Sequence, residues 1–274
     1  MRYFKMNGCG NDFVMFDARA HGALALTPAQ AGAIASRAEG IGCDQVIAIE
    51  RSLRGDAFMR IWNADGQEVA ACGNAARCVG HFLLEETGSP SIKIETLAGM
   101  LKAWRADQLI SVDMGSPLLK WEEVPVSKPN DTIRMDYQIK AESGAVFAGP
   151  SGVNMGNPHA VFFVEDVMAV PIAELGQKMA KDPFFPEGVN AGFAQVHSRT
   201  RLRLRVWERG AGLTKACGTG ACAALVAAHR AGHCERRADV ELDGGILTIE
   251  WKASDDRVLM TGPVQIEHAG EVSL

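Results

Sequence analysis

The amino-acid sequence predicts an α+β fold made of two copies of one domain. Short strand-like runs recur along the chain, broken by Gly, Asp or Pro, and each half also holds one long segment with helical character. Motifs of the first half reappear in the same order in the second half after 145–146 residues. This period is far too long for a solenoid, so it indicates duplicated domains related by an approximate two-fold axis.

The repeat consists of short motifs that pair one to one. The pairs are Gly10-Asn11 with Gly156-Asn157, Arg60–Asn63 with Arg205–Glu208, Cys72-Gly73 with Cys217-Gly218, Glu95 and Gly99 with Glu241 and Gly245, and Val112, Met114 and Pro117 with Val258, Met260 and Pro263. One coincidence has no weight, but five in one order at nearly one spacing indicate duplication. We expect an N-terminal domain formed by residues 1–117 and 263–274, and a C-terminal domain formed by residues 118–262.

Local patterns place the elements of each copy. Strands are expected at Val46–Glu50, Phe58–Trp62, Ile92–Glu95, Leu101–Trp104, Leu109–Met114, Ala160–Val164, Arg201–Trp207, Ile246–Trp251 and Val258–Met260. Central helices are expected at Asn74–Glu86 and Thr219–Ala231, each followed by a helix-stopping glycine, and a further helix at Pro28–Ala38. Strands around one central helix per copy define an α+β architecture. No GxGxxG motif follows a strand, so a dinucleotide-binding domain is unsupported.

Composition excludes several classes of function. The formal net charge is −5, and Lys and Arg form no long runs, which argues against nucleic acid or an anionic membrane as partner. No apolar run approaches the roughly 18 residues that a membrane span needs. The chain begins directly with a strand-like run and shows no targeting pattern, so a cytoplasmic location is expected.

Seven cysteines raise the question of which thiols are reactive. No CxxC occurs and no pair has zinc-finger spacing, and His229 and His233 lack the glutamate of a zinc-protease motif, so no metal site is expected. A buried structural role is expected for five of the thiols, because free cysteine is among the most buried residue types. These are Cys9, Cys43, Cys78, Cys222 and Cys234.

The other two cysteines occupy equivalent places in the repeat. Cys72 and Cys217 each stand directly before a glycine and at the start of an expected central helix. A helix N-terminus carries partial positive charge and unpaired N–H groups, so it is expected to ease ionisation of the thiol and to bind a carboxylate. Gly73 and Gly218 would let the backbone approach that carboxylate closely.

A two-fold relation between the copies gives these cysteines a chemical role. We expect the two helix N-termini to face each other across an interdomain cleft, with one thiol on each face of the substrate α-carbon. One thiolate then removes the α-proton while the opposite thiol delivers a proton, which is two-base racemisation. A thiol–disulfide redox protein and a pure binding protein for a diamino acid remain alternatives, although neither needs matched acid–base thiols.

The chain carries four further motifs in order, which are Met6–Phe13, Asn63–Asn74, Gly156–His159 and Glu208–Gly220, and together they span nearly the whole chain. In combination they resemble the diaminopimelate epimerase family. Cys-Gly-Thr-Gly alone is shared with proline racemase-like enzymes, whose pattern has Cys-Gly-His at the first cysteine. The chain has Cys72-Gly73-Asn74 there, which favours diaminopimelate. Another amino-acid racemase that works without pyridoxal phosphate stays the runner-up.

The resemblance implies a fold and a reaction. Each domain would be a strongly curved, barrel-like and mostly antiparallel sheet around its central helix. The enzyme would interconvert LL- and meso-diaminopimelate in lysine and peptidoglycan precursor biosynthesis, with no cofactor and no metal. It would act on this small molecule as a homodimer, with no nucleic-acid or membrane partner.

The resemblance also assigns roles to residues. Cys72 and Cys217 are the acid–base pair, and His159 and Glu208 support the proton transfers. The expected substrate-binding residues are Gly73, Asn74, Gly218 and Thr219 at the reacting carboxylate, Glu208 at the reacting ammonium, and Asn11, Gln45, Asn63, Asn157, Asn190 and Arg209 around the rest of the substrate. Amide side chains donate and accept at once, which suits the zwitterionic ends, and an arginine fork grips a carboxylate with two hydrogen bonds. Taken alone, Glu208-Arg209 also fits a solvated ion pair.

Overall fold

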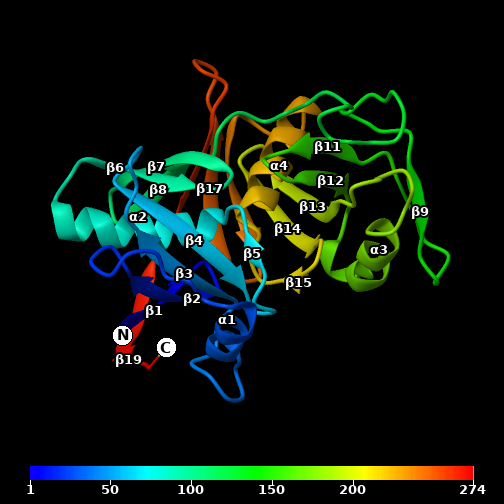
Figure 1. The fold of residues 1–274 in the computed structure, drawn as a ribbon. Helices are drawn as coiled ribbons and strands as arrows, with labels where there is room; N and C mark the ends of the chain where they lie inside the picture. The colour runs from blue at the N-terminus through cyan, green and yellow to red at the C-terminus, as the bar shows by residue number, and fades with distance from the viewer. Residues whose placement is uncertain (274) are drawn as a thin grey trace. The chain divides into compact units, whose positions relative to one another are not determined.

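The computed structural model describes residues 1–273, and the chain divides into two compact units. The first unit is Met1–Asp113 together with the C-terminal segment from Thr261, and the second unit is Met114–Met260. Both units combine a mixed sheet with helices, which confirms the predicted α+β class and the duplication (Figure 1).

The first unit is built on a mostly antiparallel sheet. Its strands are β1 (Arg2–Gly8), β2 (Asn11–Asp17), β3 (Gln45–Glu50), β4 (Ala57–Asn63), β5 (Glu68–Val69), β6 (Ser91–Thr96), β7 (Gly99–Ala106), β8 (Leu109–Asp113) and β19 (Gln265–Glu271). Hydrogen bonds order them β19–β1–β2–β3–β4–β6–β7–β8, and β5 pairs with β4. Only β2–β3 and β4–β6 run parallel among these pairs.

Two helices pack on this sheet. The central helix α2 (Gly73–Thr87) lies against β1, β6, β7 and β8, and α1 (Pro28–Ala35) lies against β3 and β4. The close approach of α2 requires Gly80, because a Cβ there would lie 2.6 Å from the Cβ of Ala103. The helix ends at Gly88 in the left-handed conformation, as the expected stop signal indicates.

The second unit repeats the same pairings. Its strands are β9 (Gln138–Lys140), β10 (Val146–Ala148), β11 (Ser151–Asn154), β12 (Pro158–Phe163), β13 (Asn190–Ser198), β14 (Arg201–Glu208), β15 (Gly212–Thr214), β16 (Arg237–Leu242), β17 (Gly245–Trp251) and the beginning of β18 (Val258–Gly262). The order β11–β12–β13–β14–β16–β17 matches β1–β2–β3–β4–β6–β7, with the same two parallel pairs. The hairpin β9–β10 has no counterpart in this pattern.

The helices of the second unit also follow the first. The central helix α4 (Gly218–Arg230) packs against six strands from β11 to β17, and α3 (Ile172–Met179) packs against β13, β14 and β15. A short 3₁₀ turn, η1 (Val167–Ala169), precedes α3. The sequence analysis did not predict α3, which is short and carries an interior glycine, a weak helix former. Gly176 is needed there because a Cβ would lie 2.1 Å from Cγ of Trp207.

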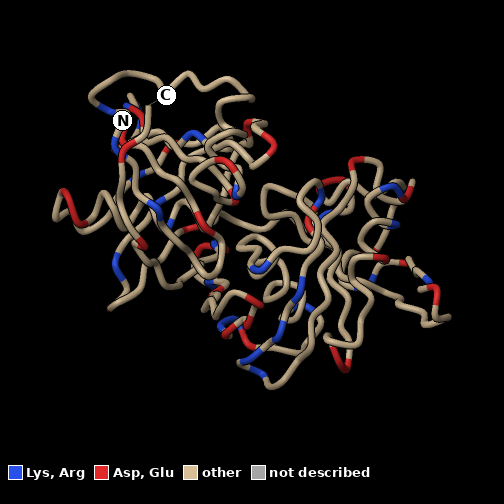
Figure 2. The backbone as a smooth tube through the Cα atoms, turned by 90° about the horizontal axis from the view of Figure 1, so that it is seen from below, with Lys and Arg blue, Asp and Glu red and all other residues tan. Residues whose placement is uncertain are grey.

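Charge is mixed over both units. Figure 2 shows Lys and Arg interspersed with Asp and Glu along the backbone of each unit. Within residues 1–273, no helix has the length and apolar content that crossing a membrane requires.

Candidate active site

The two candidate cysteines are the N-cap residues of the central helices. Cys72 precedes α2 with φ −148° and ψ 116°, and Cys217 precedes α4 with φ −116° and ψ 105°. Both conformations are extended, as N-cap residues require, so the expected position of each cysteine at a helix start is confirmed. The first N–H groups of a helix have no partner within the helix, and each N-terminus therefore offers donors to a carboxylate.

In the first unit, Cys72 lies beside two asparagines. Its half-buried side chain makes no capping hydrogen bond, and its Sγ lies 3.8 Å from Oδ1 of Asn11. Asn74, which is buried in the first turn of α2, donates from Nδ2 to the same oxygen at 3.4 Å. The Asn11 oxygen thus accepts from the helix start and faces the thiol.

A second amide pair lies where β3 begins and β4 ends. Gln45 and Asn63 are cross-strand partners, and Nε2 of Gln45 donates to Oδ1 of Asn63 at 2.9 Å. The pairing leaves Oε1 of Gln45 buried, with no hydrogen-bond partner among residues 1–273. Buried acceptors are rarely left unpaired, so this oxygen is suited to receive a donor from a bound molecule such as an ammonium group.

In the second unit, Cys217 is 4% exposed and caps its own helix. Its Sγ accepts from N of Gly220 at 3.3 Å and lies 3.6 Å from Oγ1 of Thr219. Burial raises the pKa of the Cys217 thiol well above its usual value, and the negative charge of Glu208 raises it further. The expectation that the helix N-terminus eases ionisation is therefore wrong for Cys217, because burial raises the pKa of the thiol more than the hydrogen bonds from Thr219 and Gly220 lower it. A neutral thiol is a proton donor.

His159 is the buried centre of the second unit's polar cluster. Its ring is 1% exposed, and Nε2 lies 3.0 Å from Oδ1 of Asn157 and 3.2 Å from Oγ1 of Thr219. Nδ2 of Asn190 lies 3.5 Å from the same nitrogen. Burial lowers the pKa of His159 to about 3, so the imidazole is neutral at neutral pH. Its Nδ1 is buried and has no hydrogen-bond partner within residues 1–273.

Glu208 and Arg209 follow at the end of β14. Oε1 of Glu208 accepts from the hydroxyl of Thr214, and the backbone N of Arg209 donates to Oδ1 of Asn190 at 2.7 Å. The exposed Arg209 guanidinium donates to the backbone carbonyl of Glu187. The amide of Asn190 thus ties β13 to β14 beside the histidine.

The predicted site residues are divided between the two units. The first unit holds Asn11, Gln45, Asn63, Cys72, Gly73 and Asn74. The second unit holds Asn157, His159, Asn190, Glu208, Arg209, Cys217, Gly218 and Thr219. The sequence analysis missed Asp44 and Thr214, which contact these residues; the one available signal for Asp44 was its place directly before Gln45.

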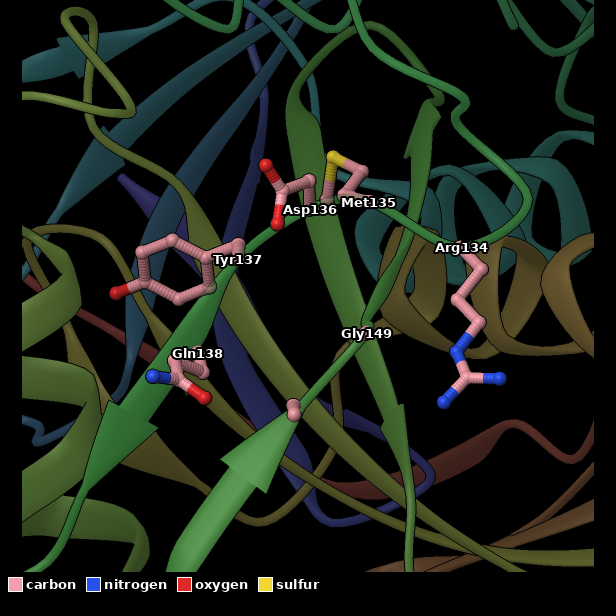
Figure 3. Close-up of a pocket in the computed structure, with 7 residues that line it drawn as sticks. Arg134, Met135, Asp136, Tyr137, Gln138 and Gly149 are labelled. Atoms are coloured by element: carbon pink, nitrogen blue, oxygen red, sulfur yellow. The ribbon is translucent and has the colours of Figure 1, made fainter.

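A pocket in the second unit does not involve the predicted residues. It has a volume of about 270 Å³ and is lined by Arg134, Met135, Asp136, Tyr137, Gln138, Ala148 and Gly149. Figure 3 shows the side chains of Tyr137 and Arg134 on opposite sides of Gly149. The Tyr137 hydroxyl donates to Asp182 at 3.0 Å, and Asp136 pairs with Lys128, so neighbouring residues already engage these polar groups.

Solved structures share this duplicated fold. One is a probable proline racemase from Agrobacterium radiobacter K84, with a TM-score of 0.70 and 16% identity over 100% of this chain and 93% of that chain. Another is a PhzF-family phenazine biosynthesis protein from Bacillus anthracis, with a TM-score of 0.69 and 15% identity over 100% and 99% of the two chains. These similarities define the architecture, a duplicated α+β fold of the proline racemase type.

Sequence comparison defines the family. A family model described as diaminopimelate epimerase matches residues 3–120 and 151–267. A diaminopimelate epimerase from Phenylobacterium zucineum is 54% identical over 98% of this chain and 97% of its own length. One from Acidiphilium cryptum is 52% identical over 98% and 95%. The chain belongs to the diaminopimelate epimerase family, as its motifs indicate, and is an isomerase.

Proposed function

We propose that the protein epimerises LL-diaminopimelate to meso-diaminopimelate with Cys72 and Cys217 as its two acid–base groups. The observation that carries this proposal is the pair of N-cap cysteines in matched contexts before matched helices. A single reactive thiol needs no duplicate, whereas inversion at a carbon needs one base and one acid. Membership of the family supplies the substrate.

The proposed reaction conserves protons and needs no oxidant. One cysteine, as the thiolate, removes the α-proton and becomes a thiol. The other, as the thiol, gives its proton to the opposite face of the α-carbon and becomes a thiolate. The C–H bond on one face is thus exchanged for a C–H bond on the other, and the two sulfurs swap roles until the next turnover.

The helix N-termini would stabilise the charge that develops. Removal of the α-proton leaves negative charge on the α-carbon and its carboxylate. Gly73 and Asn74 begin one helix, and Gly218 and Thr219 begin the other, so their N–H groups are suited to hold that carboxylate. Preorganised donors of this kind lose little energy to reorganisation as the charge develops.

The remaining polar groups fit a substrate with two ammonium and two carboxylate groups. Glu208 carries the charge that suits the reacting ammonium, and the neutral His159 would relay or accept a hydrogen bond near Thr219. Arg209, exposed and held at its backbone N, would grip the distal carboxylate. Asn11, Gln45, Asn63, Asn157 and Asn190 would orient the remaining groups, and an analogue lacking one of those groups would leave a buried amide unpaired.

The assay is racemisation of LL-diaminopimelate with no added cofactor, in deuterated water. We expect the meso isomer to form and solvent deuterium to enter at the α-carbon. Cys72→Ala and Cys217→Ala should each lower kcat by about 10⁴-fold or more, since two groups that act as a unit fail together. Cys234→Ser is the matched control, because this buried cysteine contacts the carbonyl of Ser198 and not the site, and it should keep full activity.

Other outcomes identify the alternatives. Turnover of proline or hydroxyproline, with none of diaminopimelate, indicates another racemase of the same fold. Activity with thioredoxin or glutathione and none with amino acids indicates a thiol redox protein. Substantial epimerisation by either cysteine variant would show that the two-base reaction is wrong.

The cellular setting follows from the same proposal. The product would feed lysine and peptidoglycan precursor biosynthesis in the cytoplasm, with the enzyme as a homodimer. Light scattering coupled to size-exclusion chromatography tests the dimer: a mass near 29.4 kDa would mean a monomer, and twice that mass a dimer.

A further inference from the structure

We propose that Asp44 is a positioning residue whose carboxylate turns the Asn11 side-chain amide so that Oδ1, and not Nδ2, faces the Cys72 sulfur. Asp44 lies one residue before β3, and Asn11 is the first residue of β2. Nδ2 of Asn11 donates to Oδ2 of Asp44 at 2.8 Å. Because a carboxylate only accepts, this bond fixes which end of the amide points each way.

The Asp44 carboxylate is itself held in place by reciprocal bonds to Asp12. The backbone N of Asp12 donates to Oδ2 of Asp44 at 3.1 Å, and the backbone N of Asp44 donates to Oδ1 of Asp12 at 3.1 Å. Arg37 then bridges both carboxylates, donating from Nη2 to each at 2.8 Å. Lys5, which is buried, pairs with Asp12. The bonds and charges of Lys5 and Arg37 hold the pKa of Asp12 well below its usual range, against the opposing effect of burial.

The residues Arg77, Asn74, Asn11 and Asp44 form one hydrogen-bonded array, and Arg77 stands at the end opposite Asp44. From that end Arg77 orients the side-chain amides of Asn74 and Asn11 in the same direction as Asp44 does. Arg77 is fully buried in α2, and its Nη1 donates to Oδ1 of Asn74 at 2.9 Å. A guanidinium only donates, so Asn74 must present its oxygen to Arg77 and its Nδ2 to Asn11. The chain of donors therefore runs from Arg77 through Asn74 and Asn11 to Asp44, with one permitted direction.

This direction has a consequence at the thiol. Oδ1 of Asn11, fixed from both sides, is an acceptor 3.8 Å from the Cys72 sulfur, so it favours the S–H form. A rotated amide would place N–H groups at the sulfur and favour the thiolate instead. The array thus favours the S–H form of Cys72 and holds the Asn11 amide in the orientation proposed for substrate binding. The effect on catalysis rests on the function proposed above.

The second unit has no equivalent array. Val189 stands before Asn190 where Asp44 stands before Gln45, and Asn157 turns its oxygen to His159 at 3.0 Å. The positioning role is therefore particular to the first unit and is not a general feature of the repeat.

The test is a double-mutant cycle on Asp44 and Asn11 with two readouts. The first is the rate at which iodoacetamide alkylates Cys72 at one fixed pH, followed by mass spectrometry of the Cys72 peptide, and it needs no substrate. The second is kcat/KM for LL-diaminopimelate. We expect Asp44→Ala to speed alkylation about fivefold, because the Asn11 amide loses its shorter fixing bond and keeps only the 3.4 Å bond from Asn74, and to lower kcat/KM about tenfold. In an Asn11→Ala background the same change should alter neither rate.

Conservative variants separate orientation from charge and from folding. Asp44→Asn removes the charge but keeps an oxygen for Asn11, so it should retain most of both wild-type rates. Arg37→Gln removes the ion pair but not the acceptor, and should match the wild type. If Asp44→Ala lowers the melting temperature sharply, Asp44→Leu repeats the test with a side chain of similar size and no acceptor.

The results separate this inference from the proposed function. Equal effects of Asp44→Ala with and without the Asn11 side chain would overturn the positioning role, since they would mean a direct charge effect. So would an Asp44→Asn variant as altered as Asp44→Ala. Absence of diaminopimelate turnover in the wild type would sink the proposed function alone, because the alkylation cycle still measures the orientation of Asn11.

Discussion

The two central helices start in the same way, yet their N-cap cysteines lie in different surroundings. Cys72 is half-buried, leaves its own helix uncapped and faces an amide oxygen of Asn11. Cys217 is buried, caps its own helix through Gly220 and has a raised pKa. Duplication therefore preserved the backbone geometry, whereas the side chains around each thiol diverged. An enzyme that treats two mirror-related faces of a carbon needs the shared geometry, but nothing requires the two thiols to titrate alike.

The two units differ most at one equivalent strand position, where the first has a phenylalanine and the second a histidine. Phe13 pairs with Gln45 across β2 and β3, and at the equivalent place His159 pairs with Asn190 across β12 and β13. The first unit is thus apolar at this point, whereas the second carries a neutral imidazole beside Thr219.

The largest expected effect is a loss of activity when His159 of the second unit is replaced by phenylalanine, the residue that the first unit has at the equivalent place. His159→Phe should lower kcat by about 10²-fold or more, because it removes the group that supports proton transfer near Cys217. His159→Gln, which keeps a hydrogen-bonding side chain, should lose less. Both are measured as deuterium incorporation and epimerisation, with melting temperature as the folding control. Unchanged activity in a folded His159→Phe variant would mean that the histidine has only a packing role.

The next largest effect concerns matched glycines in the peripheral helices. A Cβ at Gly176 in α3 would lie 2.1 Å from Cγ of Trp207, whereas one at Gly32 in α1 would meet nothing closer than 3.7 Å. We expect Gly176→Ala to destabilise the protein by about 3 kcal/mol, since the Trp207 ring must shift. Gly32→Ala should stabilise it by about 0.5–1 kcal/mol through helix propensity. Urea unfolding measures both, and equal effects would contradict the tight packing of α3.

The buried histidine also predicts a pH dependence of stability that Phe13, at the equivalent place in the first unit, does not contribute. The folded-state pKa of His159 is about 3, against an ordinary value of 6.5. Between these values the unfolded chain binds a proton that the folded chain does not, so stability falls as pH is lowered through this window. The slope from this residue is about 1.4 kcal/mol per pH unit. It should vanish in His159→Gln, as measured by the difference in unfolding free energy between variant and wild type from pH 6.5 to pH 4.

The smallest expected effect is a difference in thiol reactivity. Cys72 is half-buried, whereas Cys217 is buried and has a raised pKa, so iodoacetamide should modify Cys72 about tenfold faster at pH 8. Peptide mass spectrometry after timed quenching gives both rates in one sample. Faster modification of Cys217 would reverse the comparison between the two helix starts.

Much of the fold could be predicted from the sequence, because its strands and central helices depend on patterns of neighbouring residues. Short, partly alternating runs predicted β3, β4 and β14, and segments rich in Ala, Leu and Val, each closed by a glycine, predicted α2 and α4. The repeat then predicted that both units share one topology, which the matching strand pairs confirm. The sequence analysis did not predict the helix α3, because its stability comes from packing on Trp207 rather than from the helix propensity of its own residues.

The sequence by itself determined the duplicated α+β fold, the N-cap position of both cysteines and the family. These follow from local propensity and from motifs that are contiguous in the chain. Only the tertiary structure decided how each thiol is solvated, that burial raises the pKa of Cys217, and that Asp44 turns Asn11 toward Cys72. The physical reason is that desolvation and hydrogen-bond direction depend on partners brought together from distant segments. The Cys72 sulfur faces Asn11, which is bound in turn by Asp44, and no pattern near residue 72 encodes this arrangement.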